Sequence, residues 1–200
     1  MNTKERIQKF KSEGKGLMTK YQYEAIGNLL EELSPCKFLV FGLGEDSFLW
    51  SEINAGGRTV FLEDDIEWSE KFQSSNLEIH NVKYTTEISK FNEIKFDKER
   101  LRISFPEAID DIKWDLILVD APLGHGPPNP DSPWKNTPGR PFKGPGRMSS
   151  IFEASTRVKK DGFVIVDDLS RKVEAMYSDH FLGKENLKQL IENKVGIYQL

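Results

Sequence analysis

Cysteine is almost absent from this sequence, since Cys36 is the single one among 200 residues. One thiol can form no disulfide within the chain, and it cannot supply a zinc site built from several cysteines. We therefore expect a chain that works in the reducing cytoplasm rather than a secreted, disulfide-bonded protein.

Long apolar runs are also missing. No stretch of the sequence approaches the ~20 apolar residues that a helix needs to span a bilayer. The N-terminal residues from Met1 to Ile7 are mostly polar and lack the apolar segment of a signal peptide. We expect no membrane span and no secretory leader, whether the chain is a complete protein or a domain of a larger one.

The sequence has no excess of basic residues. Its 28 Lys and Arg are outnumbered by 32 Asp and Glu, and the net charge is −4. Proteins that bind nucleic acid present a basic face to the phosphate backbone, so nucleic acid is not an expected partner. Hydrophobic residues make up 38% of the chain, which is enough for the core of one domain at this length.

What the sequence does contain is an alternation of strand and helix patterns. Apolar runs typical of buried parallel strands occupy residues 38–41, 59–62, 114–120 and 162–168, and the alternation over 77–84 indicates another strand. Helical patterns occupy residues 19–33, 47–53, 65–73, 106–111, 147–159 and 184–192, and a last strand is expected at 195–200. This alternation predicts an α/β fold, with one doubly wound, mainly parallel sheet in a single domain over residues 19–200, preceded by an arm or helix over 1–18.

The first predicted strand runs into a glycine turn, Gly42-Leu43-Gly44. Glycine can adopt positive φ and lets a ligand approach the backbone closely. Asp46 and Ser47 offer an N-cap for the helix that follows. Because ligands of parallel sheets bind at the carboxyl ends of the strands, this turn is a candidate nucleotide-binding site.

The second predicted strand ends in Glu63 and Asp64. An acid at this position holds ribose hydroxyls in nucleotide-binding α/β folds. A nicotinamide-dependent oxidoreductase is disfavoured, because the dinucleotide fingerprint Gly-x-Gly-x-x-Gly is incomplete here, with Ser47 in place of its third glycine.

Two further predicted strands end in aspartates, Asp120 on one and Asp167 with Asp168 on the other. Carboxylates crowded together repel one another, and a hard cation such as Mg²⁺ or Mn²⁺ relieves that repulsion. The three aspartates are therefore candidate metal ligands. Capping of helices or hydrogen bonds to loop amides are the alternative.

Residues 121–145 contain eight of the chain's ten prolines and lie between two predicted elements. Segments of this length often form binding loops. His125 follows Asp120 closely and could remove a proton from a hydroxyl, although a hydrogen bond to the backbone is an equal alternative.

The same segment and its end carry candidate substrate contacts. Trp134 could stack on a sugar face or anchor the loop. Arg140 and Arg147 could contact an acidic or hydroxyl-rich substrate, with solvated charge as the alternative.

Several segments together resemble one known family, the glucuronoxylan 4-O-methyltransferases of plant polysaccharide biosynthesis. The resemblance covers residues 19–187 in blocks that keep the family's order. The blocks are Phe41-Gly-Leu-Gly-Glu-Asp-Ser-Phe-Leu-Trp50, Gly56-Gly-Arg-Thr-Val-Phe-Leu-Glu-Asp64, Trp114-Asp-Leu-Ile-Leu-Val-Asp-Ala-Pro122, Gly144-Pro-Gly-Arg-Met-Ser-Ser-Ile-Phe152, Val166-Asp-Asp168, Arg171-Lys-Val-Glu174 and Asp179-His-Phe-Leu-Gly-Lys-Glu-Asn186.

This resemblance implies a class I (Rossmann-like) methyltransferase fold, S-adenosylmethionine as methyl donor and a sugar hydroxyl of a glycan or glycoside as acceptor. Residues 121–145 would shape the acceptor pocket, with Asp120 and His125 as the catalytic groups. The expected cofactor contacts are Gly42, Leu43, Gly44, Asp46, Ser47, Glu63, Asp64 and Asp120.

The three strand-end aspartates also resemble the pattern of metal-dependent sugar and small-molecule O-methyltransferases, which implies assistance by Mg²⁺ or Mn²⁺. A uronic acid or a deoxysugar such as rhamnose is the expected acceptor. A non-sugar small molecule, or a non-catalytic module that keeps the cofactor fold, remains the alternative.

Overall fold

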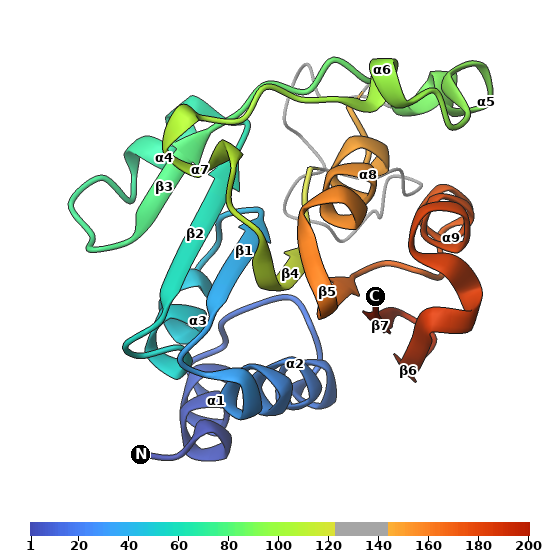
Figure 1. Cartoon of the computed structure of the whole chain (residues 1–200). Coiled ribbons are helices and arrows are strands. Elements are labelled where there is room, and N and C mark those ends of the chain that lie inside the picture. The colour runs from blue at the N-terminus through green and yellow to red at the C-terminus, as the bar shows by residue number, and fades with distance from the viewer. Residues whose placement is uncertain (123–143) are drawn as a thin grey trace.

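The computed structural model describes residues 1–122 and 144–200. Within these residues, seven strands form one sheet in the order β3-β2-β1-β4-β5-β7-β6 (Figure 1). The strands are β1 (Lys37–Phe41), β2 (Arg58–Glu63), β3 (Glu78–Asn81), β4 (Trp114–Val119), β5 (Val158–Val166), β6 (Leu187–Ile191) and β7 (Val195–Gln199). From β3 to β5 the neighbours are parallel, whereas β7 is antiparallel to β5 and β6. The predicted α/β class and mainly parallel sheet are confirmed.

Helices cover both faces of the sheet. They are α1 (Thr3–Ser12), α2 (Lys20–Leu33), α3 (Ser47–Ile53), α4 (Ile66–Glu70), α5 (Phe91–Ile94), α6 (Lys98–Leu101), α7 (Glu107–Asp110), α8 (Met148–Arg157) and α9 (Lys172–Ser178). The buried residues of α1, α2 and α3 pack on one face, and those of α6 to α9 pack on the other.

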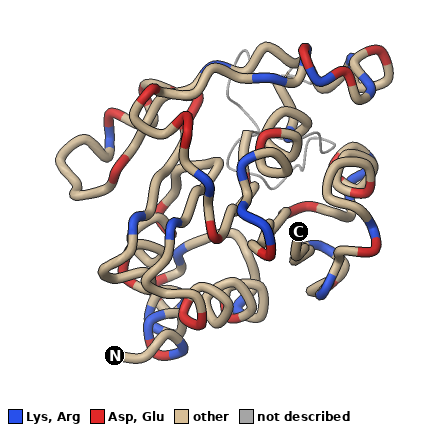
Figure 2. Tube along the Cα trace, viewed as in Figure 1, with Lys and Arg blue, Asp and Glu red and all other residues tan. Residues whose placement is uncertain are grey.

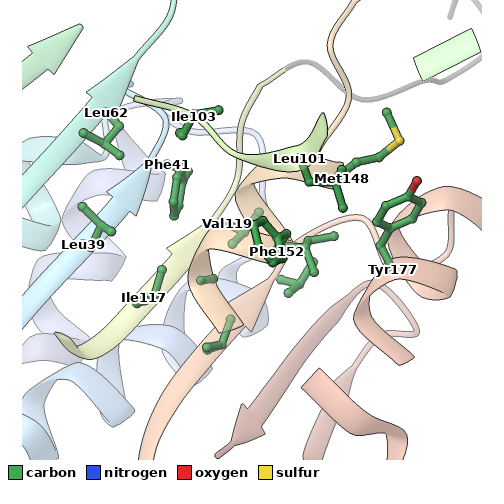
Figure 3. Packing of buried hydrophobic residues seen from close by; sticks show 14 of the residues in the cluster. Leu39, Phe41, Leu62, Leu101, Ile103, Ile117, Val119, Met148, Phe152 and Tyr177 are labelled. Atoms are coloured by element: carbon green, nitrogen blue, oxygen red, sulfur yellow. The ribbon is translucent and has the colours of Figure 1, made fainter. Parts of the chain in front are cut away.

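Strand β1 shows how the two cores arise. Leu39 and Phe41 point into the core shared with α8 and α9, whereas Phe38 and Val40 belong to the core beneath α1, α2 and α3. Successive strand residues point to opposite faces, so a strand buried on both sides must be apolar throughout. Figure 3 shows Leu39 and Phe41 in the first core, together with Phe152 of α8.

The N-terminal residues form a helix that belongs to this core. Asn2 and Glu5 make a capping box at the start of α1, which satisfies backbone groups that a helix end otherwise leaves unpaired. Ile7 is fully buried and Phe10 nearly so, both against α2 and its neighbours. Of the two predictions for residues 1–18, the helix is therefore the one observed.

The C-terminal region departs from the sequence-based prediction. The helix expected at 184–192 is wrong, because residues Leu187–Ile191 form edge strand β6, which pairs antiparallel with β7. Lys188, Gln189 and Leu190 are exposed on this edge, so the strand lacks the alternation that identifies a half-buried one. Pairing with β7 decides its conformation. Helix α9 was not predicted.

The distribution of charged residues and the helices of the described part agree with what the composition predicts. Figure 2 shows acidic and basic residues interspersed along the chain, which has a net charge of −4. Within residues 1–122 and 144–200, no helix combines the length and the apolar character needed to cross a membrane.

The topology brings four strand ends to one place. Chain order runs outward from β1 to β2 and β3 on one side, and from β4 to β5 on the other. The switch point between β1 and β4 is where open α/β sheets bind ligands. The glycine turn follows β1, Glu63 ends β2, Asp120 follows β4, and the Asp167–Asp168 pair follows β5.

Candidate functional site

A cavity of about 400 Å³, part of it open to solvent, lies at this switch point. It is formed by the ends of β1, β2 and β4 and by the start of α3. The residues that line it are Val40, Gly42, Leu43, Gly44, Asp46, Trp50, Glu63, Leu118, Asp120 and Ala121. Most of the residues predicted to contact the cofactor are among them, whereas Ser47 and Asp64 do not line the cavity.

Gly42 holds the ends of β1 and β4 close together. Its φ of +123° lies in a region that residues with a Cβ rarely adopt, and a Cβ built there would meet Ala121 Cβ at 3.0 Å. The Gly42 amide donates to Leu62 O (2.8 Å), and the Ala121 amide donates to Phe41 O (2.8 Å). The backbone of the turn thus forms one wall of the cavity with no side chain in the way.

Glu63 is held rigidly at the end of β2. Its Oε1 accepts from the amides of Asp64 and Asp65, each at 2.9 Å, and its Oε2 accepts from the Leu43 amide at 3.2 Å. Burial raises the pKa of Glu63 to about 7, against the lowering effect of these amides. Oε1 already accepts two hydrogen bonds, whereas Oε2 accepts only one and can still accept another from a ligand.

Asp46 does not form the N-cap hydrogen bond that was predicted for it. Helix α3 begins at Ser47 as expected, but within the described structure the Asp46 side chain makes no cap hydrogen bond. Its Oδ2 instead accepts from the hydroxyl of Tyr23 in α2, at 3.0 Å. Burial raises the pKa of Asp46. Asp46 also lines the cavity.

Ser47 stabilises the glycine turn through hydrogen bonds with Gly44. Its side chain is almost fully buried, and its Oγ accepts from the Gly44 amide at 3.0 Å. The Ser47 amide in turn donates to Gly44 O at 3.1 Å. Ser47 thereby holds the glycine turn against α3.

The three strand-end aspartates come together as predicted, but a guanidinium lies between them. Arg147 Nη2 lies 2.9 Å from Asp168 Oδ2 and 3.2 Å from Asp120 Oδ1. Its Nη1 donates to the backbone O of Asp167 at 2.8 Å and lies 3.6 Å from Asp167 Oδ2. Arg147 immediately precedes α8 and is only 5% exposed.

This arrangement does not support the expected metal site and bears on the role of Arg147. Among residues 1–122 and 144–200, no group of three or more His, Cys, Asp or Glu has a geometry that could hold a metal ion. The donors predicted for Mg²⁺ or Mn²⁺ at Asp120, Asp167 and Asp168 are engaged by Arg147. Arg147 is not the solvated charge that was the alternative for it, because its guanidinium is buried among carboxylates, and its contact with a substrate stays a prediction.

Further charges surround this cluster. Asp168 also pairs with Arg171 at 2.8 Å, and Lys194 Nζ lies 3.6 Å from both Asp167 Oδ1 and Asp168 Oδ1. Burial raises the pKa of Asp120 well above its usual range, Arg147 opposes this, and Asp167 adds to it. Asp120 thus combines contact with the cavity and a raised pKa.

The backbone after Asp120 is anchored by residues that sequence reasoning missed. Ser150 Oγ donates to Ala121 O at 2.9 Å and lies 3.1 Å from the Tyr84 hydroxyl. Thr86 Oγ1 donates to Pro145 O, also at 2.9 Å. No local motif marks these residues, because their partners lie far away in the sequence. His125, Trp134 and Arg140 lie outside the described residues.

Comparison with solved structures supports the fold class. The chain is similar to the T. thermophilus 16S rRNA N2 G1207 methyltransferase (RsmC), solved in complex with AdoMet and guanosine. The TM-score is 0.51 at 13% identity, over 92% of this chain and 44% of that one. At this identity the similarity concerns the fold alone, which is that of class I methyltransferases.

Curated relatives are more informative about family. Arabinogalactan O-methyltransferase 2 of Arabidopsis thaliana is 35% identical over 182 residues, which cover 78% of this chain and 57% of that protein. Glucuronoxylan 4-O-methyltransferase 3 of the same plant is 36% identical over 185 residues, covering 80% of this chain and 57% of that protein. The chain therefore spans little more than half the length of these relatives.

A family model, described as IRX15/IRX15L/GXM, matches residues 22–103 and 92–196. The two matches together span nearly all of the sheet and include the glycine turn, Glu63, Asp120, Arg147 and the Asp167–Asp168 pair. This chain belongs to the IRX15/IRX15L/GXM family.

Proposed function

We propose that this chain is an S-adenosylmethionine-dependent O-methyltransferase that acts on a sugar hydroxyl of a polysaccharide or glycoside. The observation that carries the proposal is the cavity at the β1–β4 switch point, lined by Gly42, Gly44 and Glu63. Two relatives from the same family are named as polysaccharide O-methyltransferases, which supports a carbohydrate acceptor.

The residues of the cavity fit the methyl donor. Glu63 offers Oε2 to a ribose hydroxyl, and the turn Gly42–Gly44 leaves its backbone open to the methionine part. Asp46 supplies a carboxylate for an ammonium group. S-adenosylmethionine brings a methyl group on a positively charged sulfur, and the protein's task is to align the acceptor oxygen with it.

Transfer of a methyl group to a hydroxyl releases a proton, which needs a base. Asp120 is the candidate that the structure describes, because it lines the cavity and its pKa is raised by burial. His125 remains the second candidate, on the sequence argument alone. Assistance by Mg²⁺ or Mn²⁺ was also predicted, but the described residues do not fit such an ion, so no step depends on one here.

The finer identity of the acceptor remains a proposal. A uronic acid or a deoxysugar such as rhamnose would present hydroxyls to the rim near Asp120. A non-sugar small molecule is the alternative acceptor. A non-catalytic module that only keeps the cofactor fold is the alternative function.

Two measurements test the proposal in sequence. Calorimetry with S-adenosylhomocysteine and with NAD should show binding of the first, and binding of NAD alone would refute a methyltransferase. An acceptor screen with methyl-labelled S-adenosylmethionine should span glucuronosides, rhamnosides and xylosides, with the product linkage determined by NMR. Binding of S-adenosylhomocysteine without transfer to any acceptor would favour the non-catalytic module.

A further inference from the structure

We infer that Arg147 is the resident cation of the three strand-end aspartates, in the place that the aspartate pattern assigns to a divalent metal ion, and that it is the positioning residue for Asp120. The inference rests on the proposed function, because Asp120 is taken to face the acceptor. It concerns the one buried guanidinium at the cavity end of the described sheet, which contacts residues after two neighbouring strands.

The contacts show how one side chain joins two strand ends. Nη2 bridges Asp120, which follows β4, and Asp168, which follows β5, at 3.2 and 2.9 Å. Nη1 donates to the backbone O of Asp167 at 2.8 Å. A guanidinium is a planar fork with its donors in fixed directions, so the same group that neutralises the carboxylates also sets their positions.

The geometry leaves little room for a metal ion beside Arg147. A bound Mg²⁺ needs oxygen ligands at about 2.1 Å in near-octahedral arrangement. Asp168 Oδ2 and Asp120 Oδ1 already contact Nη2, and a second, divalent cation would be repelled by the fixed positive charge. An ion could be bound by these aspartates only if Arg147 moved out.

Glu174 of α9 supplies additional counter-charge for Arg147. Its side chain is 1% exposed. Burial raises the pKa of Glu174, and the charge of Arg147 opposes this rise. Among the described residues neither Glu174 oxygen has a hydrogen-bond partner, so Glu174 does not compete for Nη1 or Nη2. The guanidinium thus pairs with three carboxylates, and Glu174 adds only its charge. Arg171 and Lys194 supply further positive charge to the aspartates.

The first experiment uses the unmodified protein and does not depend on any acceptor. Chelator-treated protein is titrated with Mn²⁺, and bound ion is measured by electron paramagnetic resonance. We expect no stoichiometric Mn²⁺ binding. One equivalent of Mn²⁺ bound by the wild type and lost in Asp168→Asn would overturn the inference.

The second experiment tests positioning. In Arg147→Ala we expect kcat to fall on the order of 100-fold, as small misplacements of reacting groups do, while S-adenosylhomocysteine affinity changes less than about threefold. Guanidinium chloride at millimolar concentration should restore part of kcat, and KCl at equal ionic strength should not. Arg147→Lys keeps the positive charge but lacks the planar, forked guanidinium. Its kcat should lie between those of the wild type and Arg147→Ala.

The matched control is Arg157, the last residue of α8, which pairs with Glu153 and Asp110. Arg157→Lys should leave kcat unchanged. If Arg147→Lys retains kcat within twofold of the wild type, Arg147 is not a positioning residue. Failure of the wild type to transfer methyl would refute the proposed function, whereas the Mn²⁺ titration would still decide what holds the aspartates.

Discussion

The hydroxyl of Tyr23 donates a 3.0 Å hydrogen bond to Asp46 Oδ2 at the edge of the cavity. Tyr23 belongs to α2, before the first strand, and also stacks on Trp50 with ring centroids 5.5 Å apart. The helix that precedes the sheet therefore positions a carboxylate of the candidate cofactor site.

Removal of this hydroxyl should weaken the site. Tyr23→Phe leaves the Asp46 carboxylate with one donor fewer, and a hydrogen bond to a charged group contributes about 1.5–3 kcal/mol. We expect weaker binding of S-adenosylhomocysteine by calorimetry, with the ring packing retained. Tyr21→Phe is the control, because Tyr21 is 69% exposed, and equal effects of the two substitutions would contradict the role of Tyr23.

Glu63→Gln should reduce cofactor affinity and leave the fold intact. If Glu63 accepts from ribose hydroxyls, loss of the charged acceptor costs about 1.5–3 kcal/mol of binding free energy. Calorimetry with S-adenosylhomocysteine measures the loss, and circular dichroism checks the fold. Glu70→Gln, an exposed carboxylate at the end of α4, is the control. Unchanged affinity in Glu63→Gln would move the ribose contact to another residue, such as Asp64.

The raised pKa of Glu63 predicts opposite effects of pH on stability and on binding. A carboxyl whose pKa rises from 4.5 to about 7 on folding binds more protons in the folded state. Its contribution to the free energy of unfolding is therefore fully present below pH 4.5 and is lost as pH rises through 7. Ionisation makes Glu63 a better acceptor, so affinity for S-adenosylhomocysteine should increase from pH 6 to pH 8. The same titration on Glu63→Gln should be flatter; an identical slope would assign the effect to another group.

Gly42→Ala should destabilise the protein and narrow the cavity. The substitution meets both an unfavourable φ of +123° and a Cβ contact of 3.0 Å with Ala121, and we expect a loss of about 1–3 kcal/mol in the free energy of unfolding. Urea denaturation gives this value. Gly14→Ala separates the two causes, because Gly14 also has positive φ but nothing lies within 4 Å of its Cβ position. The crowding argument fails if both variants lose the same amount.

The two candidate bases can be distinguished by substitution. Asp120→Asn should lower kcat by roughly 10²–10⁴-fold, the usual contribution of general base catalysis. His125→Ala should lower kcat comparably only if the histidine is the base. Steady-state kinetics with the acceptor identified in the screen, together with cofactor affinity, measures both. A normal kcat in Asp120→Asn across pH would remove Asp120 as the base.

Local sequence was enough to predict the first half of the site. The glycine turn depends on residues adjacent in the chain, and Glu63 ends a strand whose apolar run is continuous. Their placement follows from the general rule that parallel strands end at one edge of a sheet. The strands from β1 to β5 were likewise readable, because burial on both faces demands apolar strands, whereas the short helices α5 and α6 were not predicted.

Where a residue's conformation depends on a distant partner, the sequence-based prediction was wrong. Leu187–Ile191 is a strand because β7 pairs with it, and its own exposed side chains carry no strand signal. Asp46 stands at an N-cap position, but its carboxylate binds Tyr23, 23 residues earlier. In both cases a tertiary contact outweighs the local preference.

The sequence by itself determined the α/β class, the position of the glycine turn and the convergence of Asp120, Asp167 and Asp168, since each follows from apolar periodicity and strand ends. Only the tertiary structure decided which cation joins those aspartates. Arg147 lies 27 residues from Asp120 and 20 from Asp167 along the chain, and no spacing rule connects them. The packing of α8 on β4 and β5 brings the guanidinium of Arg147 into the cluster, where buried carboxylates require a positive charge.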